Sequence, residues 1–461
     1  MASVDDIAEF RGTERFQIIR RLGAGGMGMV YEALDRERNA RVALKTLRTM
    51  SPEELLALKH EFRALQDVTH PNLVTLGELI EDRERWFFTM ELVQGHNVLR
   101  YIRGANASEV TSDLSTVSGT TLALEEALPP PREPGAQRFD EAKLRFALTQ
   151  LAHGLNALHA ARKVHRDIKP ANVLVNGNGR VVVLDFGLAF DTQRDTGWEP
   201  RFAGTLGYMA PELFTSGTIG KAGDWYATGV LLFESLTGRQ PFHAATKLAL
   251  LDAQQQDGPA PSESTAGVPR DLDELCQDLL RHDPERRPDG NEVLRRLGQV
   301  SRAHRKSITG HPFVGRGAEL ARLDQAMAEV RGGRGVTVTV RGESGVGKSY
   351  LVRQFTNRLL ARAPTAVILA GRCYERESVP YKALDGIVDE LTGFLSATLA
   401  NELPDLLPAG LRALAQVFPV LHQIVTTARQ PAVIDERDPQ AVRAEASAAL
   451  RVVRRTPVCS P

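Results

Sequence analysis

The sequence predicts an α+β domain over residues 15–298 and, after it, an incomplete α/β domain over residues 313–461. Two observations predict this order. Before residue 100, short apolar alternations typical of strands surround one amphipathic helix, and from residue 140 onward helical patterns dominate. After residue 334, a strand pattern, a glycine-rich loop ending in Lys-Ser and a helix follow one another, as in a parallel α/β unit. A chain of 461 residues is long enough for two or three domains.

Composition argues against several classes of protein. The chain carries 57 basic and 57 acidic residues, so its formal net charge of +0 favours neither nucleic acid nor an anionic membrane as a partner. No apolar run approaches the ~20 residues that cross a bilayer, and the N-terminus lacks the apolar core of a signal peptide. The 3 cysteines are too widely spaced for a disulfide framework or a zinc site. We therefore expect a soluble, cytoplasmic protein with no membrane span.

A glycine-rich loop follows the first predicted strand. Residues 1–14 form a polar tail, and the strand alternation begins at Phe16. Residues 23–28 read Gly-Ala-Gly-Gly-Met-Gly, and residues 29–33 read as a second strand. A dinucleotide-binding loop would instead be followed by a helix. The loop is therefore predicted to fold over phosphate groups, because glycines let the backbone approach them closely. Taken alone, a flexible surface hairpin would be the simpler interpretation.

A lysine and a glutamate stand out in the next two elements. The third predicted strand, over residues 41–45, ends in Lys45, whose ammonium can pair with phosphate oxygens. The helix that follows the capping sequence of residues 51–54 carries Glu61, a candidate partner that orients Lys45. A solvent-exposed position is common for a helical glutamate, and Glu53 and Glu54 are equal candidates on that reading. Further strands are predicted over Leu73–Val74 and Trp86–Met90, before a connector over residues 91–95.

Several candidate catalytic side chains lie close together in residues 165–172, which read His-Arg-Asp-Ile-Lys-Pro-Ala-Asn. This stretch follows a helix predicted over residues 140–161. This stretch offers a carboxylate, an ammonium and an amide. Together they can accept a hydroxyl proton, neutralise phosphate charge and hold a metal ion. A hairpin predicted over residues 173–184 then returns the chain to Asp185, the first residue of an Asp-Phe-Gly sequence. A solvated polar loop is the alternative interpretation.

These motifs occur in the order found in one family. Residues 16–298 resemble a eukaryotic-like serine/threonine protein kinase of the bacterial type. The resemblance implies a two-lobed protein kinase fold that binds ATP between its lobes. It also implies transfer of the γ-phosphate to serine and threonine hydroxyls of protein substrates, including autophosphorylation, in bacterial signal transduction. The matching motifs are Gly23–Gly28, Val42–Lys45 (with Leu44 in place of the commoner isoleucine), Glu61, His165–Asn172, Asp185–Gly187 and Ala210–Glu212.

The resemblance also implies roles for single residues. Asp167 is the expected catalytic base, Lys169 lies beside the transferring phosphoryl group, and Lys45 pairs with the phosphates of ATP. Asn172 and Asp185 are the expected ligands of Mg²⁺. The expected ATP contacts, with Met90 as gatekeeper and Glu91 to Val93 as hinge, are Leu22, Gly23, Ala24, Gly25, Gly26, Met27, Gly28, Val30, Ala43, Lys45, Glu61, Met90, Glu91 and Val93.

Two segments of this domain, an insertion and the activation segment, contain candidate phosphorylation sites. Residues 103–138, rich in Ser, Thr and Pro, predict a disordered loop. A tolerated surface insertion is the simpler interpretation, and a set of autophosphorylation sites is the sharper hypothesis. In the activation segment, Arg166 would pair with a phosphate on Thr192 or Thr196, whereas Thr205 resembles the family threonine that packs beside the catalytic base.

Two further residues have structural roles in the resemblance. Asp224 lies in a nearly continuous apolar helix and would tether the catalytic loop. Arg287 would pair with Glu212.

A second phosphate loop follows a linker expected over residues 299–312. A strand predicted over residues 335–340 leads into residues 342–349, which fit G-x-x-x-x-G-K-[S/T], and a helix is predicted from Tyr350. Another strand is predicted over residues 365–371. Nucleotide phosphates would lie at the N-terminus of the helix, with Lys348 reaching them and Ser349 binding Mg²⁺. The residues expected to bind this nucleotide are Gly342, Gly347, Lys348 and Ser349.

Residues 313–450 resemble the start of an AAA-like ATPase of the signal-transducing type, which implies a regulatory module and a regulatory partner. The sequence departs from that family after residue 371, where no apolar strand ends in paired acidic residues. Residues 451–456 approach such a strand before the sequence ends at Pro461. We therefore expect a truncated module that binds nucleotide poorly or without hydrolysis. A nucleotide-binding scaffold or pseudokinase, and an ATPase as the main activity, are the rival functions.

Overall fold

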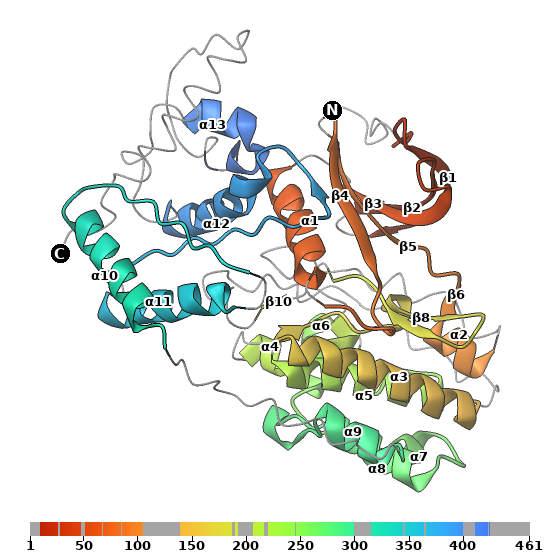
Figure 1. Ribbon diagram of the computed structural model, residues 1–461. Helices are drawn as coiled ribbons and strands as arrows, with labels where there is room; N and C mark the ends of the chain where they lie inside the picture. Colours follow the sequence, from red (N-terminus) through yellow and green to blue (C-terminus); the bar gives the residue numbers. More distant parts are fainter. Residues whose placement is uncertain are drawn as a thin grey trace. The chain divides into compact units, whose positions relative to one another are not determined.

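A computed structural model gives the fold of most of the chain (Figure 1). The chain divides into two compact units, which are described separately. The first is Met1–Ser301 together with Cys373–Lys382, and the second is Arg302–Arg372 together with Ala383–Pro461. The structure describes residues 10–25, 28–47, 51–66, 68–83, 85–104, 139–186, 190–191, 206–215, 220–244, 246–298, 315–343, 346–363, 366–399, 411–422 and 424.

The first unit begins with a twisted β-sheet lobe, shown in red and orange in Figure 1 apart from its edge strand β11, which is blue. The strands are ordered β1-β2-β3-β5-β4-β11, and all neighbours are antiparallel except β4 and β11. Phe16, Tyr31, Leu44 and Phe87 form part of the core on this sheet. The strand bounds are β1 Phe16–Gly25, β2 Gly28–Asp35, β3 Ala40–Thr46, β4 Leu76–Asp82, β5 Arg85–Glu91 and β11 Glu377–Ser378.

One helix, α1 (Pro52–Leu65), packs against this sheet, as the contact between the rings of Phe62 and Phe88 shows. The predicted N-terminal cap is confirmed, because the Ser51 hydroxyl accepts a hydrogen bond from the backbone N–H of Glu54. The prediction of a strand at Leu73–Val74 is wrong. The strand β4 begins three residues after Leu73, and Leu73 makes only an isolated bridge.

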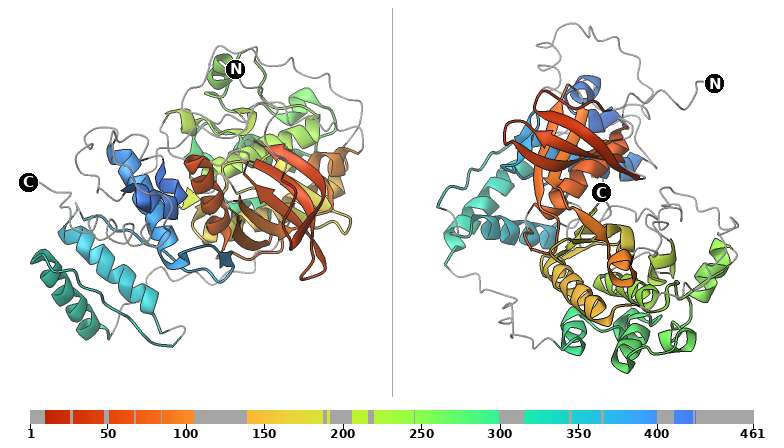
Figure 2. Two further views of the ribbon diagram at one scale, coloured as in Figure 1. Left: turned by 90° about the horizontal axis from the view of Figure 1, so that it is seen from above. Right: turned by 90° about the vertical axis from the view of Figure 1, so that its right-hand side faces the viewer.

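The remainder of the first unit is a helical lobe, so the predicted two-lobed architecture is confirmed (Figure 2). Its helix α5 is buried along almost its whole length because apolar residues surround its axis. The predicted hairpin over residues 173–184 is confirmed as β8 and β9. The helices are α2 Val98–Arg103, α3 Glu141–Ala160, α4 Glu212–Thr215, α5 Lys221–Thr237, α6 Lys247–Ala253, α7 Pro261–Ser264, α8 Arg270–Leu279 and α9 Gly290–Arg296.

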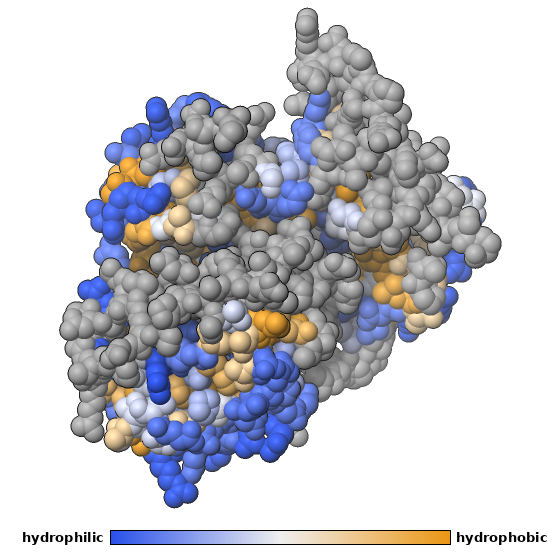
Figure 3. Space-filling view, turned by 180° about the vertical axis from the view of Figure 1, so that it is seen from behind, coloured by the Kyte–Doolittle hydropathy of each residue, from blue (hydrophilic) through white to orange (hydrophobic). Residues whose placement is uncertain are grey.

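Short elements connect these helices. Strand β6 pairs with β8, and β7 pairs with β10. The described surface of this lobe is mostly hydrophilic in the view of Figure 3, with apolar residues in small patches. Among the described helices, none is both long enough and apolar enough to cross a membrane. The bounds are β6 Gly95–Asn97, β7 Lys163–Val164, β8 Val173–Asn176, β9 Val181–Val183, β10 Phe190–Asp191, and the 3₁₀ turns η1 Pro170–Asn172, η2 Leu206–Tyr208 and η3 Pro284–Arg286.

The second unit consists of helices and extended segments where it is described. The predictions of strands over residues 335–340 and 365–371 are wrong for the described residues. Those residues have no strand partner in the described chain, and the side chains of Val338 and Val367 are 49% and 45% exposed. A strand persists only where a neighbour accepts its backbone hydrogen bonds. The helices are α10 Gly317–Arg331, α11 Lys348–Arg362, α12 Lys382–Leu399, α13 Leu411–Val417 and the 3₁₀ turn η4 Pro419–Leu421.

Several predicted segments lie outside the described residues. Only the first two residues of the predicted insertion over 103–138 are described, and Arg103 is the last residue of α2. The predicted linker over residues 299–312 and the stretch over residues 451–456 also lie outside.

Candidate active site

Three charged side chains meet where the two lobes of the first unit join. Lys45, at the end of β3, donates hydrogen bonds to Glu61 Oε1 at 2.7 Å and to Asp185 Oδ1 at 2.8 Å. The side chains of Lys45 and Glu61 are only 8% and 5% exposed, whereas that of Asp185 is 45% exposed. The backbone of Asp185 lies in the left-handed region with φ of 57°. The structure therefore joins one ammonium and two carboxylates from a strand, a helix and a loop.

Burial and mutual charge set the protonation of this cluster. Burial opposes the charge of Lys45, but Asp185 and Glu61 outweigh it and raise the pKa of the ammonium. Burial likewise opposes the charge of Asp185, yet Lys45 holds the pKa of that carboxyl well below its usual range. For Glu61, burial is the larger effect and raises the pKa to about 7, although Lys45 opposes it. Asp185 therefore stays ionised at neutral pH, while Glu61 titrates near neutrality.

The second group of polar side chains lies on the loop that ends in η1. Lys169 Nζ is 2.8 Å from Asp167 Oδ2, and both side chains are nearly buried. The Asn172 side-chain nitrogen donates to the Asp167 backbone oxygen at 2.8 Å and to Asp167 Oδ2 at 2.9 Å. These bonds direct the amide oxygen of Asn172 away from Asp167. One carboxylate, one ammonium and one amide therefore converge, as the sequence of this loop predicts.

A buried carboxylate on α5 fixes the backbone of this loop. Asp224 accepts hydrogen bonds from the backbone N–H of His165 at 2.9 Å and of Arg166 at 2.8 Å. His159 Nε2 lies 2.7 Å from the same carboxylate. Arg166 has φ of 70°, an uncommon value for a residue with a side chain, and these bonds help to hold it. The tether expected from Asp224 is therefore present in the geometry.

The imidazole of His165 ties the loop to the strand that precedes Asp185. Its Nδ1 accepts from the backbone N–H of Asp167 at 3.2 Å, so Nε2 carries the proton and donates to the Leu184 carbonyl at 3.0 Å. The ring also contacts that of Phe186, with centroids 4.7 Å apart. Sequence reasoning gave His165 no role of its own, and only its place in the motif marked it.

The glycine-rich hairpin is formed by β1 and β2, with Gly25 opposite Gly28. A Cβ on Gly28 would lie 2.2 Å from the carbonyl oxygen of Thr46, so only glycine fits there. Leu22 is 40% exposed, and a Cβ on Gly23 would lie in open space. The predicted phosphate contacts at Gly26 and Met27 lie outside the described residues.

The predicted hinge follows β5. Met90 is paired with Ala43 across the β3–β5 ladder, so two of the expected ATP contacts are neighbours. The Glu91 carboxylate receives two hydrogen bonds from the Arg180 guanidinium, at 2.8 and 2.9 Å. Burial opposes the charge of Glu91, but Arg180 and the backbone N–H of Thr75 outweigh burial and lower its pKa. Arg180 was missed at the level of sequence, because a turn arginine carries no motif.

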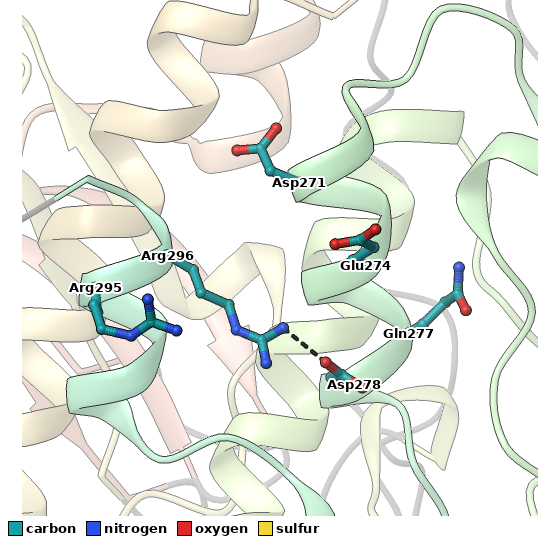
Figure 4. A pocket seen from close by; sticks show the side chains of 6 residues that line it. All are labelled: Asp271, Glu274, Gln277, Asp278, Arg295 and Arg296. Atoms are coloured by element: carbon teal, nitrogen blue, oxygen red, sulfur yellow. Dashed lines mark hydrogen bonds and ion pairs between the residues drawn. The ribbon is translucent and has the colours of Figure 1, made fainter.

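A cavity of about 270 Å³ lies beside the hinge and the β8–β9 turn. Its lining includes Glu91, Val93 and Arg180. A larger open cavity of about 440 Å³ lies between α8 and α9 and is lined by none of the predicted site residues (Figure 4). Its Arg296 and Asp278 already pair at 2.7 Å. Cavity size therefore does not locate the active site, whereas the charge cluster does.

The predicted metal ligands fit a magnesium ion in their chemistry. Mg²⁺ is commonly bound through one or two carboxylates together with phosphates of the substrate. Asp185 supplies a carboxylate, and the amide of Asn172 presents its oxygen away from Asp167. The described residues include no cluster of three or more His, Cys, Asp or Glu side chains able to hold an ion. A magnesium ion held by this pair would take its remaining ligands from phosphate oxygens and water.

Comparison with known proteins identifies this arrangement. A family model described as a protein kinase domain matches residues 16–297. The chain belongs to the protein kinase family. A second model, described as an AAA ATPase domain, matches residues 312–458, so the predicted resemblance to both families is confirmed.

Curated relatives match the kinase domain. The chain is 32% identical over 301 residues to serine/threonine-protein kinase drp72 of Corynebacterium efficiens, covering 64% of this chain and 52% of the relative. It is 31% identical over 304 residues to serine/threonine-protein kinase Pkn1 of Myxococcus xanthus, covering 64% and 39%. It is 29% identical over 285 residues to serine/threonine-protein kinase PrkC of Bacillus subtilis, covering 61% and 39%. The chain thus spans about half or less of the length of these relatives.

The activation segment of the kinase domain lies mostly outside the described residues, including Thr192, Thr196 and Thr205. Its end is anchored by an ion pair. The Arg287 guanidinium donates to both carboxylate oxygens of Glu212, at 2.8 and 2.9 Å, as expected from the sequence. A two-bond pair of this kind fixes position as well as charge.

In the phosphate loop of the AAA ATPase domain, the lysine side chain is bound by the loop itself. Gly347 lies in the left-handed region with φ of 88°, and α11 begins at Lys348. Lys348 Nζ donates to the carbonyl oxygens of Gly342 at 2.8 Å and Glu343 at 2.7 Å. Its ammonium therefore folds back on its own loop. Ser349 lies in the first turn of α11, because this helix begins two residues earlier than predicted.

Proposed function

We propose that the chain is a serine/threonine protein kinase that transfers the γ-phosphate of ATP to hydroxyl groups of protein substrates. The meeting of Lys45 with Glu61 and Asp185 carries this proposal, because it joins both lobes around one cationic group. The names of the three relatives, all serine/threonine-protein kinases, support the choice of acceptor. The presence of every charged group that phosphotransfer needs argues against a pseudokinase scaffold.

In the proposed reaction, the oxygen of a serine or threonine hydroxyl attacks the γ-phosphorus, and the bond to the β-phosphate oxygen breaks. Asp167 orients the hydroxyl and accepts its proton, and ADP leaves. Lys169, 2.8 Å from Asp167, lies where it would neutralise charge on the transferring group. Lys45 would hold the α- and β-phosphates. Mg²⁺ held by Asn172 and Asp185 would screen charge between the β- and γ-phosphates.

Adenine would lie between the two lobes, against the hinge. Ala43 and Met90, paired across β3 and β5, would contact its ring, and the backbone at Glu91 and Val93 would bind its edge. The hairpin from Leu22 to Val30 would cover the phosphates.

The domain limits are proposed as 15–298 for the kinase and 313–461 for a P-loop module, joined by a linker over 299–312. The module would act in regulation, and would bind nucleotide weakly through Lys348 and Ser349 while this lysine is held by its own loop. It is the proposed contact for a regulatory partner. We also place the protein in the cytoplasm, because ATP is its proposed substrate and both described cysteines are free thiols.

A phosphate-transfer assay on the full chain tests the proposal. With radiolabelled ATP and a generic protein acceptor, Asp167→Asn is expected to lower kcat by about 10²–10⁴-fold, because the hydroxyl loses its base. Asp185→Ala is expected to abolish transfer. The exposed Asp252→Asn on α6 is the matched control and should keep wild-type activity. Lys348-dependent ATP turnover in Asp167→Asn protein would instead favour an ATPase as the main activity.

A further inference from the structure

One strand of the kinase-domain sheet comes from the sequence of the AAA ATPase domain. The segment Cys373–Lys382 forms part of the first compact unit, although it lies within the residues 312–458 that match the second family. Its strand β11 runs parallel to β4, with Glu377 opposite Leu79 (Figure 1, the blue strand beside β4). This segment therefore adds an edge strand to the sheet that carries Lys45.

Backbone and side-chain bonds fix β11 on β4. The backbone N–H of Leu79 donates to the Arg376 carbonyl at 3.0 Å, and the Arg376 guanidinium donates to the Leu76 carbonyl at 2.8 Å. Glu377 and Val379 are buried, whereas their neighbour Glu375 is exposed. Such strand addition satisfies an edge that would otherwise present unpaired N–H and C=O groups.

The buried carboxylate of β11 contacts helix α1. Arg63 donates from Nε to Glu377 Oε1 at 2.7 Å and from Nη2 to Glu377 Oε2 at 3.1 Å. The side chain of Glu377 is 0% exposed and that of Arg63 is 14% exposed. A carboxylate without water contact depends on this two-bond partner, because removing one member of a buried pair leaves the other charge uncompensated.

The same helix carries the glutamate of the active site. Arg63 follows Glu61 by two residues, which is a rotation of about 200° around a helix. Glu61 therefore points to Lys45, and Arg63 points to the opposite side, toward Glu377. Helix α1 is held by one ion pair on each side.

We propose that β11 is an internal activating strand, in which Glu377 positions α1 through Arg63 so that Glu61 reaches Lys45. This inference rests on the phosphotransfer function proposed above. Glu377 and Arg63 are positioning residues and touch neither ATP nor substrate. The residues on either side of the segment, Arg372 and Ala383, belong to the second unit. A conformational change in the second unit would therefore be transmitted to β11 through the continuous backbone. The occupied β4 edge is then the surface through which the AAA ATPase domain regulates the kinase domain.

The test compares full-length variants in steady-state kinetics and in amide hydrogen exchange of residues 52–65. Glu377→Gln, which keeps shape but removes charge, is expected to lower kcat/KM for ATP by about tenfold and to speed exchange in α1. Glu375→Gln, an exposed neighbour on the same segment, is the matched control and should change neither quantity. Arg63→Lys keeps a cation but loses the two-bond geometry. Arg63→Lys is expected to have the same effects as Glu377→Gln. It replaces Glu377→Gln in the test if the latter variant unfolds below the assay temperature.

A double-mutant cycle separates positioning from simple stabilisation. In a Glu61→Gln background, the tenfold effect of Glu377→Gln is expected to shrink to within about twofold, because the two residues act through one helix. An undiminished effect in that background, or wild-type kinetics and exchange in Glu377→Gln, would overturn the proposal. If wild type transfers no phosphate, the proposed function fails. Faster α1 exchange and weaker binding of a non-hydrolysable ATP analogue in Glu377→Gln would still support the positioning role.

Discussion

Lys45 shows how far single residues can be read from a sequence. Its motif predicted a phosphate-binding lysine, and three glutamates of the next helix were candidate partners. Only Glu61 lies 2.7 Å from Lys45, whereas Glu53 and Glu54 belong to the first turn of α1. The choice depends on how α1 packs on the sheet, which a single sequence does not specify. Arg180, the partner of Glu91, was not predicted either, because an arginine in a turn carries no motif.

The raised pKa of Glu61 predicts a pH dependence of activity. Its carboxyl has a pKa of about 7, so it is ionised above this pH and accepts from Lys45, and it is neutral below. The ratio kcat/KM reports the ionisation of groups in the free enzyme. We therefore expect kcat/KM for ATP to fall severalfold between pH 8 and pH 6, as the Glu61 carboxyl becomes neutral. The measurement is a pH profile of initial rates.

The control for this profile is Glu61→Gln. Its kcat/KM for ATP should be lower at pH 8 and nearly flat between pH 8 and pH 6. A decline of the same size in wild type and in this variant would assign the titration to another group.

At the scale of elements, the catalytic loop owes its shape to helix α5. The helix was predicted to be buried from its continuous apolar sequence, and it carries Asp224 under the loop. The bonds from His165 and Arg166 to Asp224 fix two successive backbone groups. The position of Asp167, the proposed catalytic base, is therefore set by a residue that is distant in sequence.

Asp224→Ala is expected to lower the free energy of unfolding by about 3–5 kcal/mol, because it leaves buried donors without their acceptor. Equilibrium unfolding in urea measures this. The exposed Asp271→Asn should change it by less than about 1 kcal/mol, although Asp271 pairs with Arg145. Equal losses in both variants would contradict the tether.

Stability should also depend on acid through Asp224. Burial opposes its charge, but His159 and the backbone of His165 outweigh burial and lower its pKa in the folded state. A lowered pKa contributes stability above the unfolded value of about 3.9, and this contribution is lost as the pH falls toward the folded value. The unfolding free energy of Asp224→Asn is therefore expected to fall less than that of wild type below about pH 5.

The elements that were predicted correctly are those with a local signal. The cap at Ser51, the helix α3 and the β8–β9 hairpin each follow from neighbouring residues. The strands predicted over 335–340 and 365–371 were wrong because an apolar run becomes a strand only beside a partner strand. Strand β11 was missed for the opposite reason, since Glu377–Ser378 has a partner but no apolar alternation.

At the scale of the whole molecule, the order of the two domains was predictable, but their interleaving was not. The motifs predicted which family each part resembles, and the matches to two family models confirm both predictions. No sequence pattern predicts that the segment Cys373–Lys382 packs as part of the first unit.

A fragment of residues 1–301 therefore lacks β11. It is expected to unfold at a lower temperature than the kinase unit of the full chain and to self-associate through the open edge of β4. Calorimetry and light scattering test this. A synthetic peptide of residues 373–382 should reverse both effects, whereas the same peptide with Glu377→Gln should do so less. A fragment as stable and monomeric as the full chain would contradict the prediction.

The late position of β11 in the sequence also has a consequence in time. Protein chains are synthesised from the N-terminus at about 5–20 residues per second. Glu377 is therefore made on the order of 4–15 s after Ser301 closes the main part of the first unit, at that same rate. During this interval every catalytic motif exists, but helix α1 is held on one side only. A nascent chain would thus stay poorly active until the segment that completes its sheet has emerged.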